Sequence, residues 1–512
     1  MLKKSLLGLI RKIIFKNFLT IKKKDENYFF IEIEKQLVQT QFKFKRNFLN
    51  SFLDLKNLDI NILIKQILVE KFLPYIRYTK VFFLKSEYFF FPLPFEISKN
   101  LLKNINKFNI FINYFLFLIL NFYFLFKSIV TLLRIILANN RVKTNDNENS
   151  IFINLGNFNQ YNLGKDVNLV NWYRKHFMNQ NNELHNYLIT KNKRKFLKNK
   201  NLYKSSISKI NLIKFFIFSI FYIFLSFFNL ILLRWQYSFI ATQVIEALFF
   251  KFIDNTSLYK EYLFINKTFI YRPIWTYVVE NKKSKITFIF YSCSLLTNYY
   301  MKNINNSLWK LATWPQYYFW DDEQYKFIKN NNRIPFVYKK YGFIPYVDNG
   351  NIKLKKADIC IFDEPPLKLT DMIMAGLNDN IWTIKNSIKF LEDILEISKK
   401  KNLVVCLKIK KKNSKLVKSY FRRIDQLSNK YSNLRILDYD IAPSRLIKLS
   451  KISISFPFSS TAVIAKFLKK KIIYYFPYNF PKFTKKTLIT RNIPLIINKT
   501  NLEKFIDKTF NE

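Results

Sequence analysis

KISISFPFSSTAVIAKFLKKKIIYYFP, residues 451–477, contains two β-branched or aromatic runs on either side of a short helical pattern. Ile452 to Phe456 and Ile472 to Phe476 are predicted to be strands, and Thr461 to Leu468 carries apolar residues at helical spacing. The stretch therefore predicts a strand–turn–helix–strand unit, from which parallel α/β sheets are built.

The turn of this unit holds three hydroxyl side chains, Ser459, Ser460 and Thr461. They lie where a strand passes into a helix, so hydroxyls and unpaired helix N–H groups meet outside the carboxyl end of the strand. This arrangement suits a phosphate. Ser and Thr at a helix start are also typical N-caps, and the triplet alone does not separate the two interpretations.

The same alternation extends over the C-terminal third of the chain. Strands are predicted at residues 358–362, 403–409 and 434–437, with helices at 384–399, 415–427 and 443–450. This pattern predicts a doubly wound α/β domain, which binds ligands at the carboxyl ends of its strands. Neither G-x-G-x-x-G nor a Walker motif occurs, so a dinucleotide or P-loop site has no support.

Charged and hydroxyl side chains follow four of these strands. They are Asp363 and Glu364, Lys408 and Lys410, Asp438 and Asp440, and Ser459 to Thr461. Cations and hydroxyls neutralise a diphosphate, while a carboxylate holds a ribose or sugar hydroxyl. Each alone is also typical of a helix cap or a solvated charge, but together they predict a site.

A second region of alternating strands and helices precedes the C-terminal α/β region. Lys285 to Tyr291 and Tyr317 to Trp320 read as strands, and Asp321 to Lys329 as a helix. Asp321 therefore lies at a strand end. Capping of the helix is its simplest role, and a general base for an acceptor hydroxyl is the functional alternative.

The 512 residues carry a formal net charge of +50, which attracts an anionic membrane surface, a nucleic acid or a phosphorylated substrate. No zinc-finger or RNA-recognition signature accompanies it, so no nucleic-acid partner is expected. The three cysteines lie in or beside predicted strands and are expected to be buried thiols of a cytosolic protein. With two histidines, no metal site is expected.

Two apolar stretches, 110–126 and 215–233, raise the question of membrane contact. The 19 uncharged residues of the second nearly span a hydrocarbon core of about 30 Å. The connection from Asn139 to Asn211, however, carries thirteen Lys or Arg against four Asp or Glu, and a two-span hairpin would place it outside. Buried or interfacial helices are therefore favoured over a transmembrane helix at 215–233.

The motif Pro457 to Thr461, PFSST, resembles the signature of the polysaccharide biosynthesis PFTS motif proteins, with Ser459 in place of the family's Thr. Further markers of that family occur upstream in the same order, over about half the chain. They are Arg272 to Tyr277, Thr313 to Pro315, Trp320 and Asp321, Phe362 and Asp363, Ala442 and Pro443, and Leu446 and Ile447.

The resemblance implies an α/β fold of two Rossmann-like domains in tandem, similar to the GT-B glycosyltransferases. We expect a basic helical N-terminal extension at 1–71 and an acceptor-side domain at 72–348 that includes the apolar helices. A donor-nucleotide domain with the motif at 457–461 is expected at 350–512.

The resemblance further implies a bacterial protein of surface polysaccharide biosynthesis. We expect a metal-independent glycosyltransferase without a cofactor, using a nucleotide-sugar donor and a glycan or lipid-linked glycan acceptor. It would work in the cytoplasm, at the anionic inner-membrane surface. A polyol-phosphate transferase of similar fold and a non-catalytic polysaccharide assembly protein are the alternatives.

Roles are expected for the side chains at the strand ends. Ser459, Ser460, Thr461, Lys408 and Lys410 would bind the donor phosphates. Asp321 or Asp363 would be the base, and Glu364, Asp438 and Asp440 would contact the donor nucleoside or sugar.

Overall fold

The computed structural model describes most of the chain from residue 207 onward and shorter segments before it. The described residues are 36, 39–42, 46–55, 58–69, 94–97, 107–139, 151–154, 184–187, 207–265, 270–290, 292–293, 310–332, 334–344, 353–366, 383–409, 418–439, 441–457, 459–478 and 491–511.

The N-terminal half contains a parallel sheet of six strands in the order β2-β1-β3-β4-β5-β6. The strands are β1 (Ile151–Asn154), β2 (Leu184–Tyr187), β3 (Glu261–Phe264), β4 (Lys285–Ile289), β5 (Gln316–Phe319) and β6 (Val337–Lys340). The strands β3, β4 and β5 are rich in aromatic or β-branched residues and almost wholly buried, as strands covered by helices tend to be, whereas β6 at the edge is exposed. The order reverses between β1 and β3, as in doubly wound folds.

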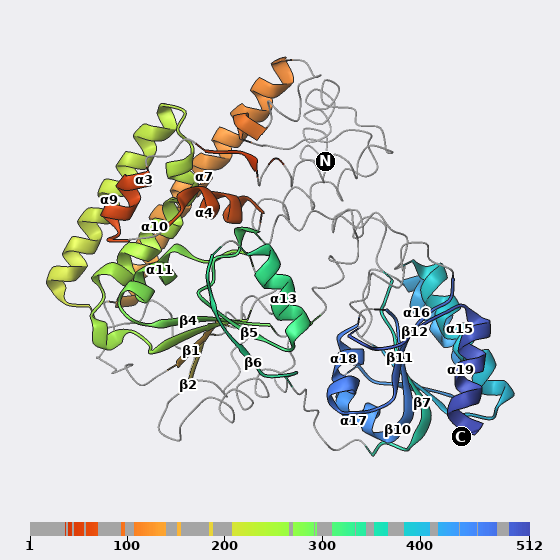
Figure 1. Ribbon diagram of the computed structural model, residues 1–512. Coiled ribbons are helices and arrows are strands. Elements are labelled where there is room, and N and C mark those ends of the chain that lie inside the picture. Colours follow the sequence, from red (N-terminus) through yellow and green to blue (C-terminus); the bar gives the residue numbers. More distant parts are fainter. Residues whose placement is uncertain are drawn as a thin grey trace.

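Helices cover this sheet mainly on one side (Figure 1). They are α3 (Arg46–Phe52), α4 (Ile60–Ile67), α7 (Lys107–Asn139), α9 (Lys209–Ile231), α10 (Gln236–Phe252) and α11 (Ile274–Asn281). The helix α13 (Asp322–Asn331) follows β5 and lies apart from them, beside β5 and β6. A short 3₁₀ turn, η2 (Asn255–Ser257), connects α10 to β3.

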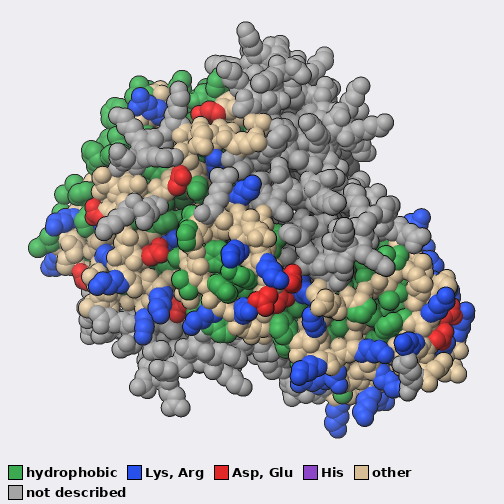
Figure 2. Space-filling model, in the orientation of Figure 1, with side chains coloured by type: hydrophobic (Ala, Val, Ile, Leu, Met, Phe, Trp, Pro, Cys, Tyr) green, Lys and Arg blue, Asp and Glu red, His purple; other side chains and the backbone are tan. Residues whose placement is uncertain are grey.

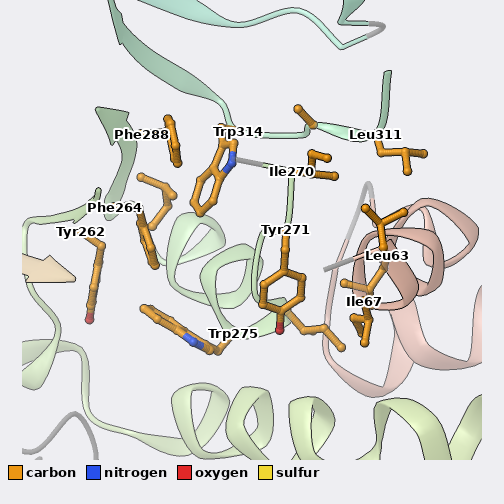
Figure 3. Packing of buried hydrophobic residues seen from close by; sticks show 14 of the residues in the cluster. Leu63, Ile67, Tyr262, Phe264, Ile270, Tyr271, Trp275, Phe288, Leu311 and Trp314 are labelled. Atoms are coloured by element: carbon orange, nitrogen blue, oxygen red, sulfur yellow. The ribbon is translucent and has the colours of Figure 1, made fainter. Parts of the chain in front are cut away.

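The N-terminal core is aromatic and includes part of the segment expected to be a separate extension. Leu63 and Ile67 of α4 are buried in the same cluster as Trp275 and Trp314 (Figure 3). Gln66 donates to the Leu311 carbonyl at 2.6 Å, which fixes α4 to the loop before β5. Residues 58–69 thus belong to this core, whereas residues 1–35 of the expected extension lie outside the described residues. The expected domain limits stay predictions.

The first apolar stretch forms a much longer helix than expected. The prediction covered 110–126, but α7 extends over 33 residues, from Lys107 to Asn139. Lys127 and Arg134 interrupt the apolar run in the sequence, yet both lie on the exposed side and leave the helical pattern intact. By length and composition alone, Tyr114–Ala138 of α7 and Lys209–Ile231 are each long and apolar enough to cross a membrane.

The C-terminal half contains a second six-stranded parallel sheet, in the order β12-β11-β10-β7-β8-β9. Its strands are β7 (Ala357–Phe362), β8 (Val405–Lys408), β9 (Leu434–Leu437), β10 (Ser450–Ser455), β11 (Ile472–Phe476) and β12 (Leu495–Ile497). Numbered from β7, this is the 3-2-1-4-5-6 order of the Rossmann fold. The prediction of an α/β fold with two Rossmann-like sheets is confirmed.

Helices lie on both faces of the C-terminal sheet (Figure 1). The helices α15 (Ile384–Lys400), α16 (Lys418–Lys430) and α19 (Lys499–Asn511) are on the side away from the N-terminal sheet. The helices α17 (Pro443–Leu449) and α18 (Ser460–Phe467) are on the near side. The apolar cluster of the N-terminal half continues into Val463 of α18 and Tyr474 of β11, so the two halves share packed side chains.

Candidate functional site

The PFTS-like turn lies at the point where the strand order of the C-terminal sheet reverses. β7 and β10 are neighbours, with Phe362 opposite Ser455 in the register. From β7 the chain continues toward β8, and from β10 it continues through α18 to β11, in opposite directions across the sheet. The two connections separate at the carboxyl ends of β7 and β10, so Asp363 and the turn border the crevice where such sheets bind ligands.

Three hydroxyl groups cluster at this turn. Thr461 Oγ1 lies 2.9 Å from Ser459 Oγ and 3.3 Å from Ser455 Oγ, and the Ser455 and Ser459 hydroxyls also hydrogen-bond each other. Ser455, the last residue of β10, is fully buried, while Ser459 and Thr461 are half-buried. Two expected site residues are therefore together, with Ser455 beneath them.

Capping does not explain Ser459, although it stands at the N-cap of α18. Its side chain makes no cap hydrogen bond to the first turn of the helix. In the same half of the chain, the Thr383 hydroxyl does cap α15, accepting from the Asn386 N–H at 3.2 Å. The first turn of α18 thus keeps N–H donors without a side-chain cap, and helix N-termini of this kind attract anions.

Asp363 lies at the end of β7 and is almost wholly buried. Its Oδ2 accepts a hydrogen bond of 2.9 Å from the hydroxyl of Tyr420, a buried residue of α16. Burial, together with the adjacent Asp363 carboxylate, raises the pKa of the Tyr420 hydroxyl well above its usual value. Tyr420 therefore remains a proton donor to Asp363 and holds that carboxylate in a fixed orientation.

The other expected site residues differ in how far they are buried. Lys408, at the end of β8, is buried, and its Nζ donates to the Tyr439 carbonyl at 3.2 Å. Glu364 is half-buried next to Asp363, and Asp438 is exposed after β9. Lys410 and Asp440 lie outside the described residues.

Ser460 contacts the N-terminal half rather than the hydroxyl cluster. Its side chain lies beside the thiol of Cys293, which follows β4. Burial raises the pKa of that thiol. The start of α18 therefore abuts the carboxyl end of the N-terminal sheet, and the PFTS-like turn lies at the junction of the two halves.

Asp321 lies at the same junction. Its carboxylate caps α13 by accepting from the Gln324 N–H at 2.9 Å, and it forms an ion pair with Arg491, which precedes β12. The capping role weighed from the sequence is therefore present. Both carboxylate oxygens have partners, because Arg491 Nε donates to Oδ2 and the Gln324 N–H donates to Oδ1.

The two family markers furthest upstream, Arg272 to Tyr277 and Thr313 to Pro315, form a structural network in the N-terminal core. The buried Arg272 donates to the Thr313 carbonyl at 2.9 Å and to Thr276 Oγ1 at 3.0 Å, and it stacks on the Tyr277 ring at 3.7 Å. Tyr277 and Thr313 share a hydrogen bond of 2.7 Å between their hydroxyls. These markers hold the layer of helices onto the sheet and lie away from the PFTS-like turn.

Sequence reasoning missed Ser455, Tyr420, Arg491 and the contact of Cys293. Ser455 follows Ser453 in a strand with alternating small residues, which gives no sign of a special role. The remaining partners come from distant parts of the chain, and their pairing has no local signal. Within the described residues, no group of three or more His, Cys, Asp or Glu side chains could hold a metal ion.

The chain thus has two Rossmann-like sheets in tandem, with a hydroxyl-lined turn at the strand-order reversal of the second sheet. Its residues 216–506 match the family described as "Polysaccharide biosynthesis PFTS motif protein". The match covers more than half of the 512 residues, so the chain belongs to this family. No curated protein matches it in sequence.

Solved structures with similar folds include the UDP-GlcNAc 2-epimerase of Methanocaldococcus jannaschii, at 10% identity and a TM-score of 0.38, covering 71% of this chain and 92% of the epimerase. A UDP-forming trehalose-phosphate synthase of Burkholderia xenovorans matches at 7% identity and a TM-score of 0.37, covering 71% and 91%. At these TM-scores the likenesses carry no conclusion about function, and the fold rests on the strand order.

Proposed function

We propose that this chain is a glycosyltransferase of surface polysaccharide biosynthesis, which uses a nucleotide-activated sugar at the cytoplasmic face of the membrane. The position of the PFTS-like turn carries the proposal. A helix start without a side-chain cap, with hydroxyls around it, borders the strand-order reversal of a Rossmann-like sheet. A diphosphate needs N–H and O–H donors at such a place.

The donor phosphates would bind at the N-terminus of α18, with Ser459 and Thr461 as hydroxyl donors. Their present hydrogen bonds are to each other and to Ser455, so each hydroxyl can rotate toward a ligand. Ser460 would join them only if its contact with Cys293 opened. Lys408, and Lys410 beyond it, would offset the charge of the leaving diphosphate.

Glu364, Asp438 and Asp440 remain the proposed contacts of the donor nucleoside or sugar. Glu364 and Asp438 follow β7 and β9, and the carboxyl ends of parallel strands share one edge of a sheet, which supports this proposal. Carboxylates accept hydrogen bonds from ribose and sugar hydroxyls.

In the proposed reaction, an acceptor hydroxyl oxygen bonds to the anomeric carbon and the bond from that carbon to the diphosphate oxygen breaks. The hydroxyl proton passes to a carboxylate, and the nucleoside diphosphate leaves. We assign the base to Asp363, which follows β7 at the strand-order reversal, and assign to Asp321 the ion pair with Arg491 and the cap of α13. Asp321 then serves to position the two halves.

The test is transfer of radiolabelled sugar from a panel of nucleotide-sugars to lipid extracted from the source membranes. Asp363→Asn should lower the rate by about a hundredfold or more, the usual contribution of a general base. Asp425→Asn changes an exposed carboxylate of α16 in the same half and should leave the rate unchanged.

Other outcomes would contradict the proposal. Transfer of labelled glycerol phosphate in place of sugar would identify a polyol-phosphate transferase. Equal rates for Asp363→Asn and the wild type would remove Asp363 from the chemistry. Absence of any transfer by folded protein, with every donor offered, would favour a non-catalytic assembly protein.

A further inference from the structure

The helices α7 and α9 bury small polar side chains among apolar ones on their inner faces and expose mainly apolar side chains. Asn121 and Ser128 of α7 and Ser219 and Ser226 of α9 are fully buried. Helices on the surface of a water-soluble protein have the opposite pattern, with an apolar stripe toward the core. Polar residues between helices and apolar residues outward are typical of helices in contact with lipid.

The buried polar groups connect α7 and α9 to the helix between them and the sheet. Ser238 of α10 donates to Asn121 Oδ1 at 3.2 Å. Tyr222 and Ser226 of α9 donate to the Tyr237 carbonyl, each at 3.4 Å. Asn121 and Ser226 are therefore paired with α10, whereas the buried Ser219 hydroxyl has no hydrogen-bond partner among the described residues.

The outer faces are continuous apolar stripes. On α7 the exposed positions include Phe115, Ile119, Phe122 and Phe126, and on α9 they include Ile217, Phe221, Phe224 and Phe228. Both sets repeat at spacings of four, three and four residues, so each forms one line along its helix. Figure 2 shows hydrophobic side chains gathered along the edge of the molecule where Figure 1 places α9. An apolar patch of this extent marks an interaction site.

The charges of the two helices are all of one sign. Neither α7 nor α9 contains an Asp or a Glu. Lys127 and Arg134 are exposed on α7, and Lys209, Lys214 and Arg234 are exposed at the two ends of α9. Cations at the rim of an apolar surface complement the anionic headgroups of a membrane.

We infer that the outer faces of α7 and α9 form one surface that inserts into a single leaflet of an anionic lipid bilayer. The helices lie along the membrane plane and do not cross it. This inference rests on the membrane location in the proposed function, but it is independent of the reaction.

The course of the chain after α9 favours the in-plane arrangement over a crossing. A turn at Leu233, with a φ of 61°, returns the chain into α10, which runs back along α9. Phe215 and Phe249 pack at 5.9 Å near one end of this pair, and Phe250 stacks on the core residue Trp275 at 4.6 Å. A bilayer around all of α9 would have to enclose α10 and the core behind it.

Vesicle flotation of the full chain tests the surface. The wild type should float with vesicles of equal parts phosphatidylglycerol and phosphatidylethanolamine, and less with phosphatidylcholine alone. Phe224→Glu/Phe228→Glu should lower the partition coefficient by about tenfold or more, because insertion of each Phe side chain into the lipid raises that coefficient by more than about tenfold. Val337→Glu, an exposed apolar site on β6, is the matched control and should float like the wild type.

Flotation that is equal in the double variant and the wild type overturns the inference. A second result would also overturn it: the wild-type protein does not bind vesicles but sediments as a dimer, and the Phe224→Glu/Phe228→Glu variant sediments as a monomer. The apolar face would then bind a second copy of the chain. Flotation needs no donor, so this failure is distinct from failure of the transfer assay.

Thiol labelling tests the orientation of α9 in sealed membrane vesicles. The three native cysteines are buried, so a cysteine introduced at Lys209 or at Arg234 is the reactive one. Both variants, Lys209→Cys and Arg234→Cys, should react with a membrane-impermeant maleimide from the same side. Reaction from opposite sides would mean that α9 crosses the membrane and would overturn the in-plane arrangement.

Discussion

Asp321 and Arg491, 170 residues apart, form an ion pair that joins the carboxyl end of the N-terminal sheet to the loop before β12. The Arg491 side chain is 6% exposed and that of Asp321 is 18% exposed. Burial disfavours a cation, but the hydrogen bond and the negative charge of the Asp321 carboxylate outweigh it and raise the pKa of Arg491. The PFTS-like turn lies beside this pair, through Ser460 and Cys293.

Breaking the Asp321–Arg491 pair should destabilise the junction of the two halves. Asp321→Asn leaves the buried guanidinium without its counter-ion, and we expect a loss of about 3 kcal/mol in the free energy of unfolding. Urea unfolding measures this loss. Glu323→Gln removes the more exposed Glu323–Lys326 pair of the same helix and should cost less than about 0.5 kcal/mol. Similar losses for both variants would mean that the junction does not depend on the pair.

The hydroxyls at two helix starts should differ in their effect on stability. Thr383→Ala removes a side-chain cap from α15 and should lower the free energy of unfolding by about 1 kcal/mol. Ser459→Ala removes no cap and should cost clearly less. Thermal unfolding of the two variants makes the comparison. A larger loss for Ser459→Ala would restore capping as its role.

Gly342, at the end of β6, requires a left-handed backbone, with a φ of 76°. An added Cβ would meet the Phe467 ring of α18 at 3.6 Å, an ordinary contact, so the backbone rather than space limits the position. Gly342→Ala should therefore lower the free energy of unfolding by about 1 kcal/mol. Gly342→Asn should lose less, because Asn tolerates this conformation better, and an equal loss in both would point to packing instead.

The buried thiols should make stability fall in alkali. Burial raises the pKa of Cys360 above its ordinary value of 9.0, so the folded chain keeps this proton when the unfolded chain has lost it. The contribution is complete below 9.0 and is lost as the pH rises above it. Chemical unfolding between about pH 8 and pH 10 should show a smaller decline for Cys360→Ala than for the wild type. Parallel declines would mean that the Cys360 thiol ionises in the folded chain.

Much of the fold could be predicted because local patterns determine it. The strand 452–456, the turn 459–461 and the strand 472–476 each carry their own signal, and the structure has β10, α18 and β11 there. The burial of the three cysteines was likewise predicted and is confirmed. The extent of α7 was not, because Lys127 interrupts a linear apolar run without interrupting the helix face.

The site could be predicted only where it follows strand ends. The position of Asp363 and Ser459 at one edge of the sheet could be predicted, because residues after adjacent parallel strands share that edge. Arg491 was not found, since an ion pair across 170 residues leaves no local pattern. The absence of a cap at Ser459 also needed coordinates, because the residue type alone favours capping.

The most direct measurement of the central claim is the thermal stability of the full chain with UDP, GDP, CDP and dTDP, compared between the wild type, Ser459→Ala/Thr461→Ala and the control Thr383→Ala. A ligand that binds only the folded state must raise the unfolding temperature. The account predicts that one nucleotide stabilises the wild type and Thr383→Ala, and that the double variant loses this response. A stabilising nucleotide whose effect persists unchanged in Ser459→Ala/Thr461→Ala would place the donor elsewhere and contradict the account.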